Sequence, residues 1–170
     1  IRVYYLYYSS GFVPYYIIHI LIYIKNNLLI RTNCHNFVFN MKESMNIKDT
    51  FLSLTSRTYP HGTEADLFYL LPQDLEIDEF GNLYKIVSDK YSTMFACHLD
   101  TATSALTDVD HVIDGDIIKT DGTSILGADD KAGVTILMYM IENNIPGLYY
   151  FFLGEEVGCV GSKKLAELHK

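Results

Sequence analysis

The chain has 170 residues and carries 13 Lys and Arg against 21 Asp and Glu, a formal net charge of −8. This length is sufficient for one domain with a buried core, and the hydrophobic share of 49% is ordinary for a globular protein. All acidic residues lie after residue 40, where 10 Lys and Arg face 21 Asp and Glu. So negative a surface argues against nucleic-acid binding, which depends on basic side chains that neutralise phosphates.

The three cysteines, Cys34, Cys97 and Cys159, are odd in number and form no close pair. This pattern is not that of a disulfide framework, and it indicates a reducing compartment, which we take to be the cytoplasm. Because no two cysteines have C-x-x-C spacing, a cysteine zinc knuckle is not predicted.

Residues 1–40 differ in composition from the rest, with seven of the 14 tyrosines and no Asp or Glu. We interpret them as an upstream segment that is not native protein, because Tyr, Ile, Asn, Leu and Phe are the residues that A+T-rich non-coding sequence yields when translated. Met41 is a suitable start for the protein itself. A hydrophobic anchor, a signal peptide and a structured extension are the alternatives. The apolar run 12–24 contains Pro14 and His19 and is shorter than the roughly 20 residues that a spanning helix needs. The functional domain is therefore expected in residues 41–170.

Segment 41–170 is predicted to alternate helices and strands. Helices are indicated by apolar residues at helical spacing and by capping residues such as Asn46, and strands by apolar runs between turn residues. Because buried strands alternate with helices, the predicted fold class is α/β, a three-layer αβα sandwich with a mostly parallel central sheet. In chain order we predict a helix at 47–55, a short helix at 64–71, a hairpin from strands 75–78 and 83–87, a strand at 94–97, a hairpin at 109–119 turning at Asp114-Gly115, a helix at 130–143, a strand at 148–153 and a helix at 162–169.

His98 and Asp100 follow the predicted strand 94–97. On an extended chain, residues two apart face the same side, and ligands bind at the carboxyl edge of open α/β sheets. A metal-binding imidazole usually donates its second N–H to a carboxylate, a part that Asp100 is placed to play. Alone, a His-x-Asp pair is common and does not establish a metal site.

Asp129 and Asp130 stand where a loop ends and a helix is predicted to begin. Helix N-termini favour negative charge, so simple capping explains one of the two aspartates. Together with His98 and Glu156, however, Asp129 supplies the oxygen and imidazole ligands that zinc accepts.

Glu155 and Glu156 come directly after the apolar strand 148–153 and Gly154. Two adjacent carboxylates at the end of a buried strand repel each other unless a positive charge lies nearby, and a metal ion supplies one. If Glu156 binds the metal, Glu155 can act as the general base that deprotonates metal-activated water. The alternative is a solvated pair in a loop.

Two other motifs are rejected, and the remaining histidines receive no assignment. Gly122 and Gly127 are spaced like a phosphate loop, but Ala128-Asp129 replaces the required Lys-Ser or Lys-Thr. The aspartates after residue 108 do not form an EF-hand, because Ile113 stands at the obligatory glycine position. Ordinary surface or core roles are expected for His19, His35, His61, His111 and His169.

Three clusters in this order resemble the co-catalytic di-zinc exopeptidases, the family of peptidase T, the aminoacylases and carboxypeptidases, and related zinc aminopeptidases. The run Asp121-Gly122-Thr123-Ser124-Ile125-Leu126-Gly127-Ala128-Asp129-Asp130-Lys131-Ala132-Gly133 is very similar to peptidase T. Asp78-Glu79-Phe80-Gly81-Asn82 resembles the early hairpin of the family, and Gly154-Glu155-Glu156-Val157-Gly158 resembles its glutamate pair. The resemblance covers roughly residues 46–168, and the long aspartate run is its most specific part.

The resemblance implies a role for each matched residue. The implied roles are His98 as a ligand of one zinc, Asp100 as the residue that orients this imidazole, Asp129 as the bridge between two zincs with a cis bond to Asp130, Glu155 as the general base and Glu156 as a ligand of the other zinc. The family needs two further ligands, a carboxylate and a histidine, later in the chain. Glu167 and His169 are not assigned to these positions. We therefore expect the N-terminal part of a catalytic domain, incomplete at its C-terminus and with little activity by itself.

The predicted function is that of a zinc-dependent metallopeptidase, an exopeptidase such as an aminopeptidase or di- or tripeptidase acting on short peptides. One alternative is an amidohydrolase that cleaves N-acyl amino acids with the same site. The other is a non-catalytic binding module that retains the fold and has lost the site. No nucleic-acid or membrane partner is expected, and the family resemblance allows a homodimer in the complete protein.

Overall fold

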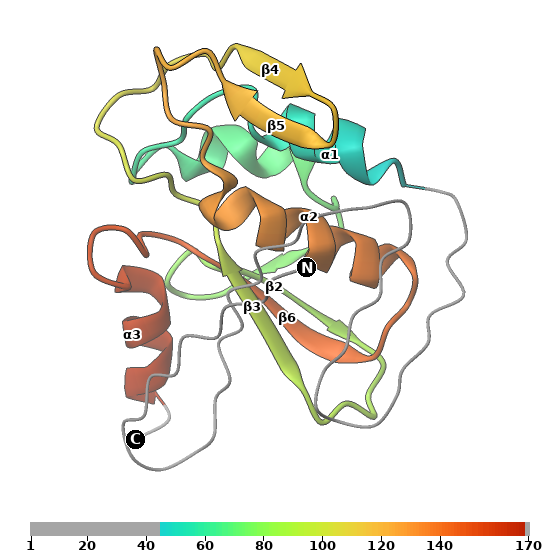
Figure 1. Ribbon diagram of the computed structural model, residues 1–170. Coiled ribbons are helices and arrows are strands. Elements are labelled where there is room, and N and C mark those ends of the chain that lie inside the picture. The colour runs from blue at the N-terminus through green and yellow to red at the C-terminus, as the bar shows by residue number, and fades with distance from the viewer. Residues whose placement is uncertain (1–44, 169–170) are drawn as a thin grey trace.

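The computed structural model describes residues 45–168, and it contains four strands in one sheet, a separate hairpin and helices on both sides of the sheet (Figure 1). No helix within residues 45–168 is long and apolar enough to cross a membrane. The proposed upstream segment 1–40, and with it the anchor alternative, lies outside the described residues.

The sheet has the strand order β1-β2-β6-β3, formed by Glu76–Ile77, Leu83–Val87, Gly147–Phe152 and Met94–His98 respectively. β3 pairs with β6 in parallel, whereas β1 with β2 and β2 with β6 are antiparallel. The predicted α/β class is confirmed, but the sheet is mixed, and among the described strands its parallel character is confined to β3 and β6.

The length of the connections explains this mixture of strand directions. The loop that joins β2 to β3, residues 88–93, is shorter than the crossover that parallel strands require. β2 therefore runs opposite to β3. The segment 99–146 between β3 and β6 contains a helix, and it is long enough to return the chain for a parallel pairing.

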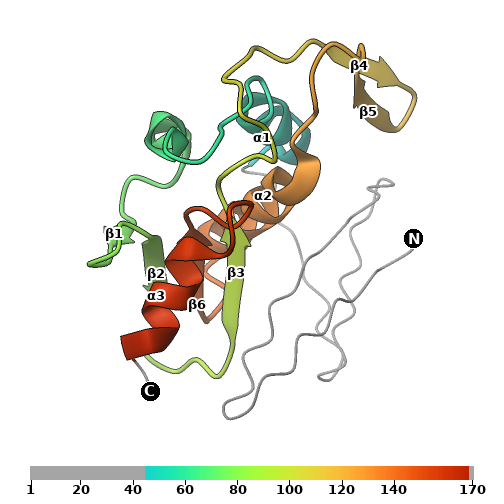
Figure 2. The ribbon, with the colours of Figure 1, turned by 90° about the vertical axis from the view of Figure 1, so that its left-hand side faces the viewer.

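The two faces of β6 are covered by different helices. Tyr149 and Phe151 are fully buried and belong to the main core, which also contains Val134 and Leu137 of helix α2 (Ala128–Glu142). Tyr150 and Phe152 alternate with them and belong to a second cluster, against which Leu165 of helix α3 (Val160–Leu168) packs. Since α2 and α3 lie on opposite sides of the sheet (Figure 2), the described residues form the expected three layers.

The predicted helix near the N-terminus is present, and helix α1 (Ile47–Leu54) packs outside α2. Its N-cap is Asn46, whose side chain accepts a hydrogen bond from the backbone N–H of Asp49 at 3.2 Å. The second predicted helix is a 3-10 helix, η1 (Glu64–Leu70), and its first residue is buried.

The hairpin predicted around Asp114 is formed by β4 (His111–Asp114) and β5 (Ile117–Thr120), above α1 and α2 in Figure 1. Its two-residue turn is Gly115-Asp116, one residue later than predicted, because Asp114 pairs with Ile117 as the last step of the ladder. Gly115 has φ of 59°, a backbone conformation that favours glycine at the first turn position.

Candidate metal centre

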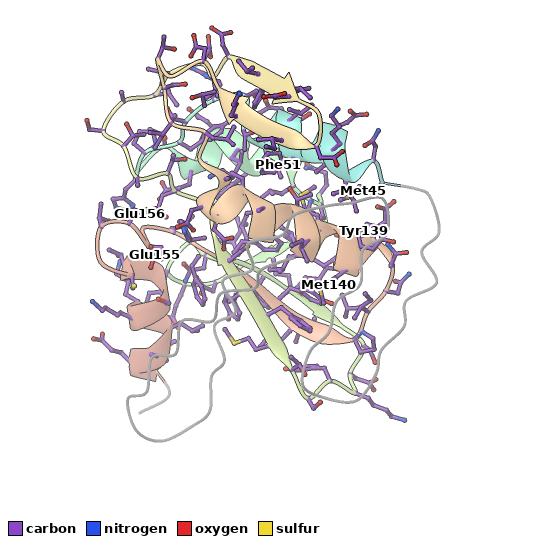
Figure 3. The ribbon with its side chains drawn as sticks, in the orientation of Figure 1. Met45, Phe51, Tyr139, Met140, Glu155 and Glu156 are labelled. Atoms are coloured by element: carbon purple, nitrogen blue, oxygen red, sulfur yellow. The ribbon has the colours of Figure 1, made fainter. Side chains whose placement is uncertain are left out.

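The predicted site residues converge where β3 and β6 end and α2 begins. His98 is the last residue of β3 and pairs in register with Phe152, the last residue of β6. Figure 3 shows Glu155 and Glu156 in the loop from β6 to α3, beside this end of β3. Asp129 is in the first turn of α2. The carboxyl ends of two parallel strands and the N-terminus of a helix thus bring together residues that are far apart in the sequence.

His98 is buried, and its two ring nitrogens face different groups. Nδ1 lies 3.1 Å from the backbone carbonyl of Asp100 and 3.3 Å from its carboxylate. Nε2 lies 3.3 Å from Oδ1 of Asp129 and 4.0 Å from Oε2 of Glu155. In the neutral imidazole, with Nδ1–H donating to Asp100, the lone pair of Nε2 would point toward the acidic residues, which is the tautomer that a metal ligand needs.

The carboxylates around His98 determine the charge of its imidazole. Burial alone lowers the pKa of His98, but hydrogen bonds with Asp100 and Asp129 outweigh burial and raise this pKa to about 10. The imidazolium is therefore the charge partner of these carboxylates. A divalent cation would take over this part and displace the proton from Nε2.

Asp100 connects the histidine to the glutamate pair. It is fully buried, and its Oδ1 and Oδ2 accept the backbone N–H groups of Glu155 and Glu156, each at 2.9 Å. Burial raises the pKa of Asp100, but the hydrogen bonds from His98 and the two amides outweigh it, so that the pKa is lowered overall. One ionised carboxylate thus fixes both the imidazole and the start of the glutamate loop.

Asp129 and Asp130 have different surroundings, although they are adjacent. The Asp129 side chain is 72% exposed and approaches His98, so it is accessible to a bound ion. Asp130 is buried, with Oδ1 accepting from Gly133 N–H at 3.0 Å and Oδ2 from His98 N–H at 3.4 Å. Burial raises the pKa of Asp130 to about 7. The peptide bond between the aspartates is cis, as the resemblance implied.

The residues around this pair explain the rest of the sequence run. Gly127 has φ of 65°, a left-handed conformation that suits glycine before the helix. A Cβ on Gly133 would lie 2.2 Å from Oδ1 of Asp130, so only glycine leaves space for this hydrogen-bonded carboxylate. Lys131 is buried and donates to the backbone carbonyl of Leu99, which links the helix to the segment after β3.

Glu155 and Glu156 complete a group of donors around His98. One ligand atom from each of His98, Glu155 and Glu156 lies within 4.8 Å of the others. Burial raises the pKa of Glu156, the charges of Asp129 and Glu155 add to this effect, and His98 opposes it. Imidazole and carboxylate donors are ligands that zinc accepts, and the excess of carboxylates favours a cation, so the residues present fit a zinc ion.

Sequence reasoning missed the buried polar residues that support the site. Glu64 was predicted only as the start of a short helix, and Asn82 only as part of a turn, yet both are buried and accept hydrogen bonds from the loop after β6. His61, predicted to have an ordinary role, contacts Glu64 at 3.0 Å. The sequence contains no local signal for the contacts of Asn82 with Leu153 and of Glu64 with Gly154, because these residues are 71 and 90 positions apart.

Comparison with known proteins is informative for sequence and fold. No protein-family model matches the chain. It is 42% identical over 78 residues to the uncharacterized protein YqjE of Bacillus subtilis, covering 42% of this chain and 21% of that protein. It is 43% identical over 56 residues to a peptidase T-like protein of Yersinia pestis, covering 29% of this chain and 14% of that protein.

Among solved structures, the aminopeptidase PepT of Bacillus cereus superposes with a TM-score of 0.58 at 29% sequence identity. This match covers 69% of the chain and 38% of PepT. The chain therefore spans about a fifth or less of the two sequence relatives and less than half of the solved structure. These comparisons confirm the predicted resemblance to the peptidase T group and the α/β fold class.

Proposed function

We propose that this chain, which resembles peptidase T in sequence and fold, is the N-terminal part of the catalytic domain of a zinc-dependent exopeptidase. The observation that carries the proposal is the convergence of His98, Asp129, Glu155 and Glu156 at the ends of β3, β6 and the start of α2. The hydrolysis itself is proposed for the complete protein, because the chain spans only 38% of the superposed aminopeptidase.

The described residues have distinct proposed roles in holding zinc. His98 would bind one ion, Glu156 would bind the other, and Asp129 would lie between them. Asp100 orients the imidazole of His98 through Nδ1 and so leaves Nε2 as the ligand atom. Zinc bound in such a site would lower the pKa of water and polarise the scissile carbonyl group of the substrate.

Glu155 is the proposed general base. Its carboxylate lies 4.0 Å from Nε2 of His98, and its side chain is 34% exposed, so it can reach a water molecule at the site and exchange protons with solvent. The Glu155 backbone is fixed by Asp100. Glu155 would take a proton from the attacking water and deliver it to the leaving amine of the peptide.

Short peptides with a free N-terminus are the proposed substrates, because one relative is named peptidase T-like and the superposed structure is an aminopeptidase. An N-acyl amino acid is the alternative substrate of the same site. We propose a cytoplasmic location for the complete protein, and the free thiols Cys97 and Cys159 agree with a reducing compartment. A homodimer is a further proposal for the complete protein.

The proposal is tested by replacing Glu155 with Gln in the complete protein and measuring hydrolysis of di- and tripeptides and of their N-acetylated forms. We expect turnover to fall by at least about 100-fold while zinc content is unchanged, because the amide cannot accept the proton. Glu142→Gln is the matched control, an exposed glutamate at the far end of α2 with the same change of charge.

Three outcomes would contradict the proposal. If Glu155→Gln retained full activity, Glu155 would not be the base. If the parent protein hydrolysed none of these substrates, or if removal of zinc by a chelator left hydrolysis unchanged, the assignment as a zinc peptidase would be wrong. Preference for N-acetylated substrates would instead support the amidohydrolase alternative.

A further inference from the structure

The loop that carries the glutamate pair is held by side chains rather than by sheet hydrogen bonds. β6 ends at Phe152, and each of the next four backbone N–H groups donates to a buried side-chain oxygen. The four contacts are Leu153 to Asn82 Oδ1 at 3.2 Å, Gly154 to Glu64 Oε1 at 3.1 Å, Glu155 to Asp100 Oδ1 at 2.9 Å and Glu156 to Asp100 Oδ2 at 2.9 Å. Side chains from outside the segment therefore help to set its path, together with the backbone N–H groups of Val160 and Gly161, which donate to the carbonyls of Gly154 and Leu153.

Glu64 is the least expected of these acceptors, because it is a carboxylate that is only 3% exposed in a short helix away from the sheet. Its Oε2 accepts the backbone N–H of Gly62 at 2.6 Å. Its Oε1 accepts the backbone N–H of Gly154 at 3.1 Å and lies 3.0 Å from Nδ1 of His61. Burial of a carboxylate is unfavourable unless its oxygens are hydrogen-bonded and its charge is compensated. The N–H group of Gly154 supplies one of these hydrogen bonds, so both oxygens of Glu64 accept a backbone N–H only while Gly154 stays in place.

The backbone conformation of Gly154 and its lack of a side chain allow this contact. It has φ of 64°, and a Cβ at this position would lie 2.8 Å from the ring of His61. The backbone thus passes directly against the His61–Glu64 pair, one residue before the proposed general base. His61 is half-exposed and covers Gly154 on the outer side.

We propose that Glu64 is a positioning residue that, with His61 as its partner, fixes the backbone from which Glu155 and Glu156 reach the metal centre. The catalytic consequence of this role rests on the proposed function, whereas the structural role does not. His61, Glu64 and Asp100 also place donor atoms within 4.8 Å of one another. They do not form a second metal site in this proposal, because the oxygens of Glu64 and Asp100 already accept backbone N–H groups.

The structural role is tested by amide hydrogen exchange on the complete chain with Glu64→Gln. Gly62 and Gly154 donate to different oxygens of Glu64, and in a glutamine one of these oxygens is replaced by an NH2 group, which opposes the N–H donor beside it. We expect the amides of Gly154, Glu155 and Glu156 to exchange about tenfold faster, a factor typical of one lost hydrogen bond. Amides in the middle of α2, such as that of Leu137, should keep the parent rate.

The matched control is Asp66→Asn, which removes the same charge from an exposed side chain of the same helix and should change none of these rates. If Glu64→Gln left the loop amides at the parent rate, or accelerated all amides of the chain equally, the positioning role would be refuted. If Glu64→Gln does not fold, His61→Ala serves instead, because this side chain is half-exposed. It should accelerate exchange at Gly154 about threefold, and an unchanged rate would refute the role of the pair.

The catalytic consequence is tested in the complete protein by separating kcat from KM. We expect Glu64→Gln to lower kcat about 10–100-fold with KM and zinc content near the parent values, as is common for residues that support a metal site. A change in KM alone would refute the effect on Glu155. If the parent protein were inactive, the proposed function would fail, while the exchange measurement would still decide the role of Glu64.

Discussion

The two acidic turns of the site, Asp129-Asp130 and Glu155-Glu156, each bring a carboxylate to Nε2 of His98 but are supported differently. In the first turn, one aspartate faces the site and the other is buried and accepts N–H groups of Gly133 and His98. In the second turn, both side chains belong to the site, and the N–H groups of the backbone are accepted by Asp100 and Glu64. Asp130 in the first turn is therefore supported both by its own helix and by β3, whereas the side chains that support the second turn lie 55 to 90 positions away.

This difference explains why the Asp129-Asp130 turn has a long sequence signature and the Glu155-Glu156 turn a short one. Gly127, Lys131 and Gly133 all lie within seven consecutive residues, and each has a constrained place, although Lys131 makes its buried contact with Leu99 after β3. The N–H groups of the glutamate loop are accepted by side chains 55 to 90 positions away, so the residues beside the glutamates carry less of the pattern that determines the loop conformation. Substitutions that remove one kind of support should affect the two turns unequally.

The largest expected effect comes from Asp100→Asn, since Asp100 contacts His98 and the backbone of both glutamates. An asparagine keeps the size but offers an NH2 group to one of the N–H donors or to Nδ1 of His98. We expect the zinc affinity of the complete protein to fall about 10–100-fold. Zinc titration measures this effect, with Asp116→Asn in the exposed hairpin turn as the control for lost charge. An unchanged affinity would show that Asp100 does not organise the site.

A smaller and more local effect is expected from alanine at Gly133 or Gly161. A Cβ on Gly133 would lie 2.2 Å from Oδ1 of Asp130, and a Cβ on Gly161 would lie 2.0 Å from Oδ1 of Asn82. Each substitution should lower the free energy of unfolding by about 1–3 kcal/mol, as is usual when a group is inserted into a packed site. Denaturant unfolding measures this change, with Lys164→Ala on the exposed face of α3 as the control.

The two glycine substitutions should also separate the two turns. Gly161→Ala is expected to accelerate amide exchange at Leu153, because Asn82 accepts this N–H, and Gly133→Ala is not. Gly133→Ala should instead accelerate exchange at its own amide, which Asp130 accepts. Equal effects of both substitutions on both turns would contradict the distinction between local and distant support.

Much of the fold was predictable because its signals are local. Asn46 caps α1 as predicted, and the apolar runs before His98 and Gly154 form the two parallel strands. The direction of β2 was not predicted, because it depends on the short connection to β3 rather than on residues within β2. For the site, the predicted residues converge because strand ends and helix starts are readable, whereas the buried position of Glu64 depends on tertiary contacts.

The central claim is most directly tested by the zinc content of the complete protein after His98→Ala, with His111→Ala as the matched control. His111 is a histidine of β4 that contacts Thr55 at 2.8 Å, and β4 belongs to the hairpin that is separate from the sheet carrying His98. We expect the parent protein to hold about two zinc ions, His98→Ala to lose at least one of them, and His111→Ala to keep both. Full zinc content after His98→Ala would contradict the assignment of this site as the metal centre.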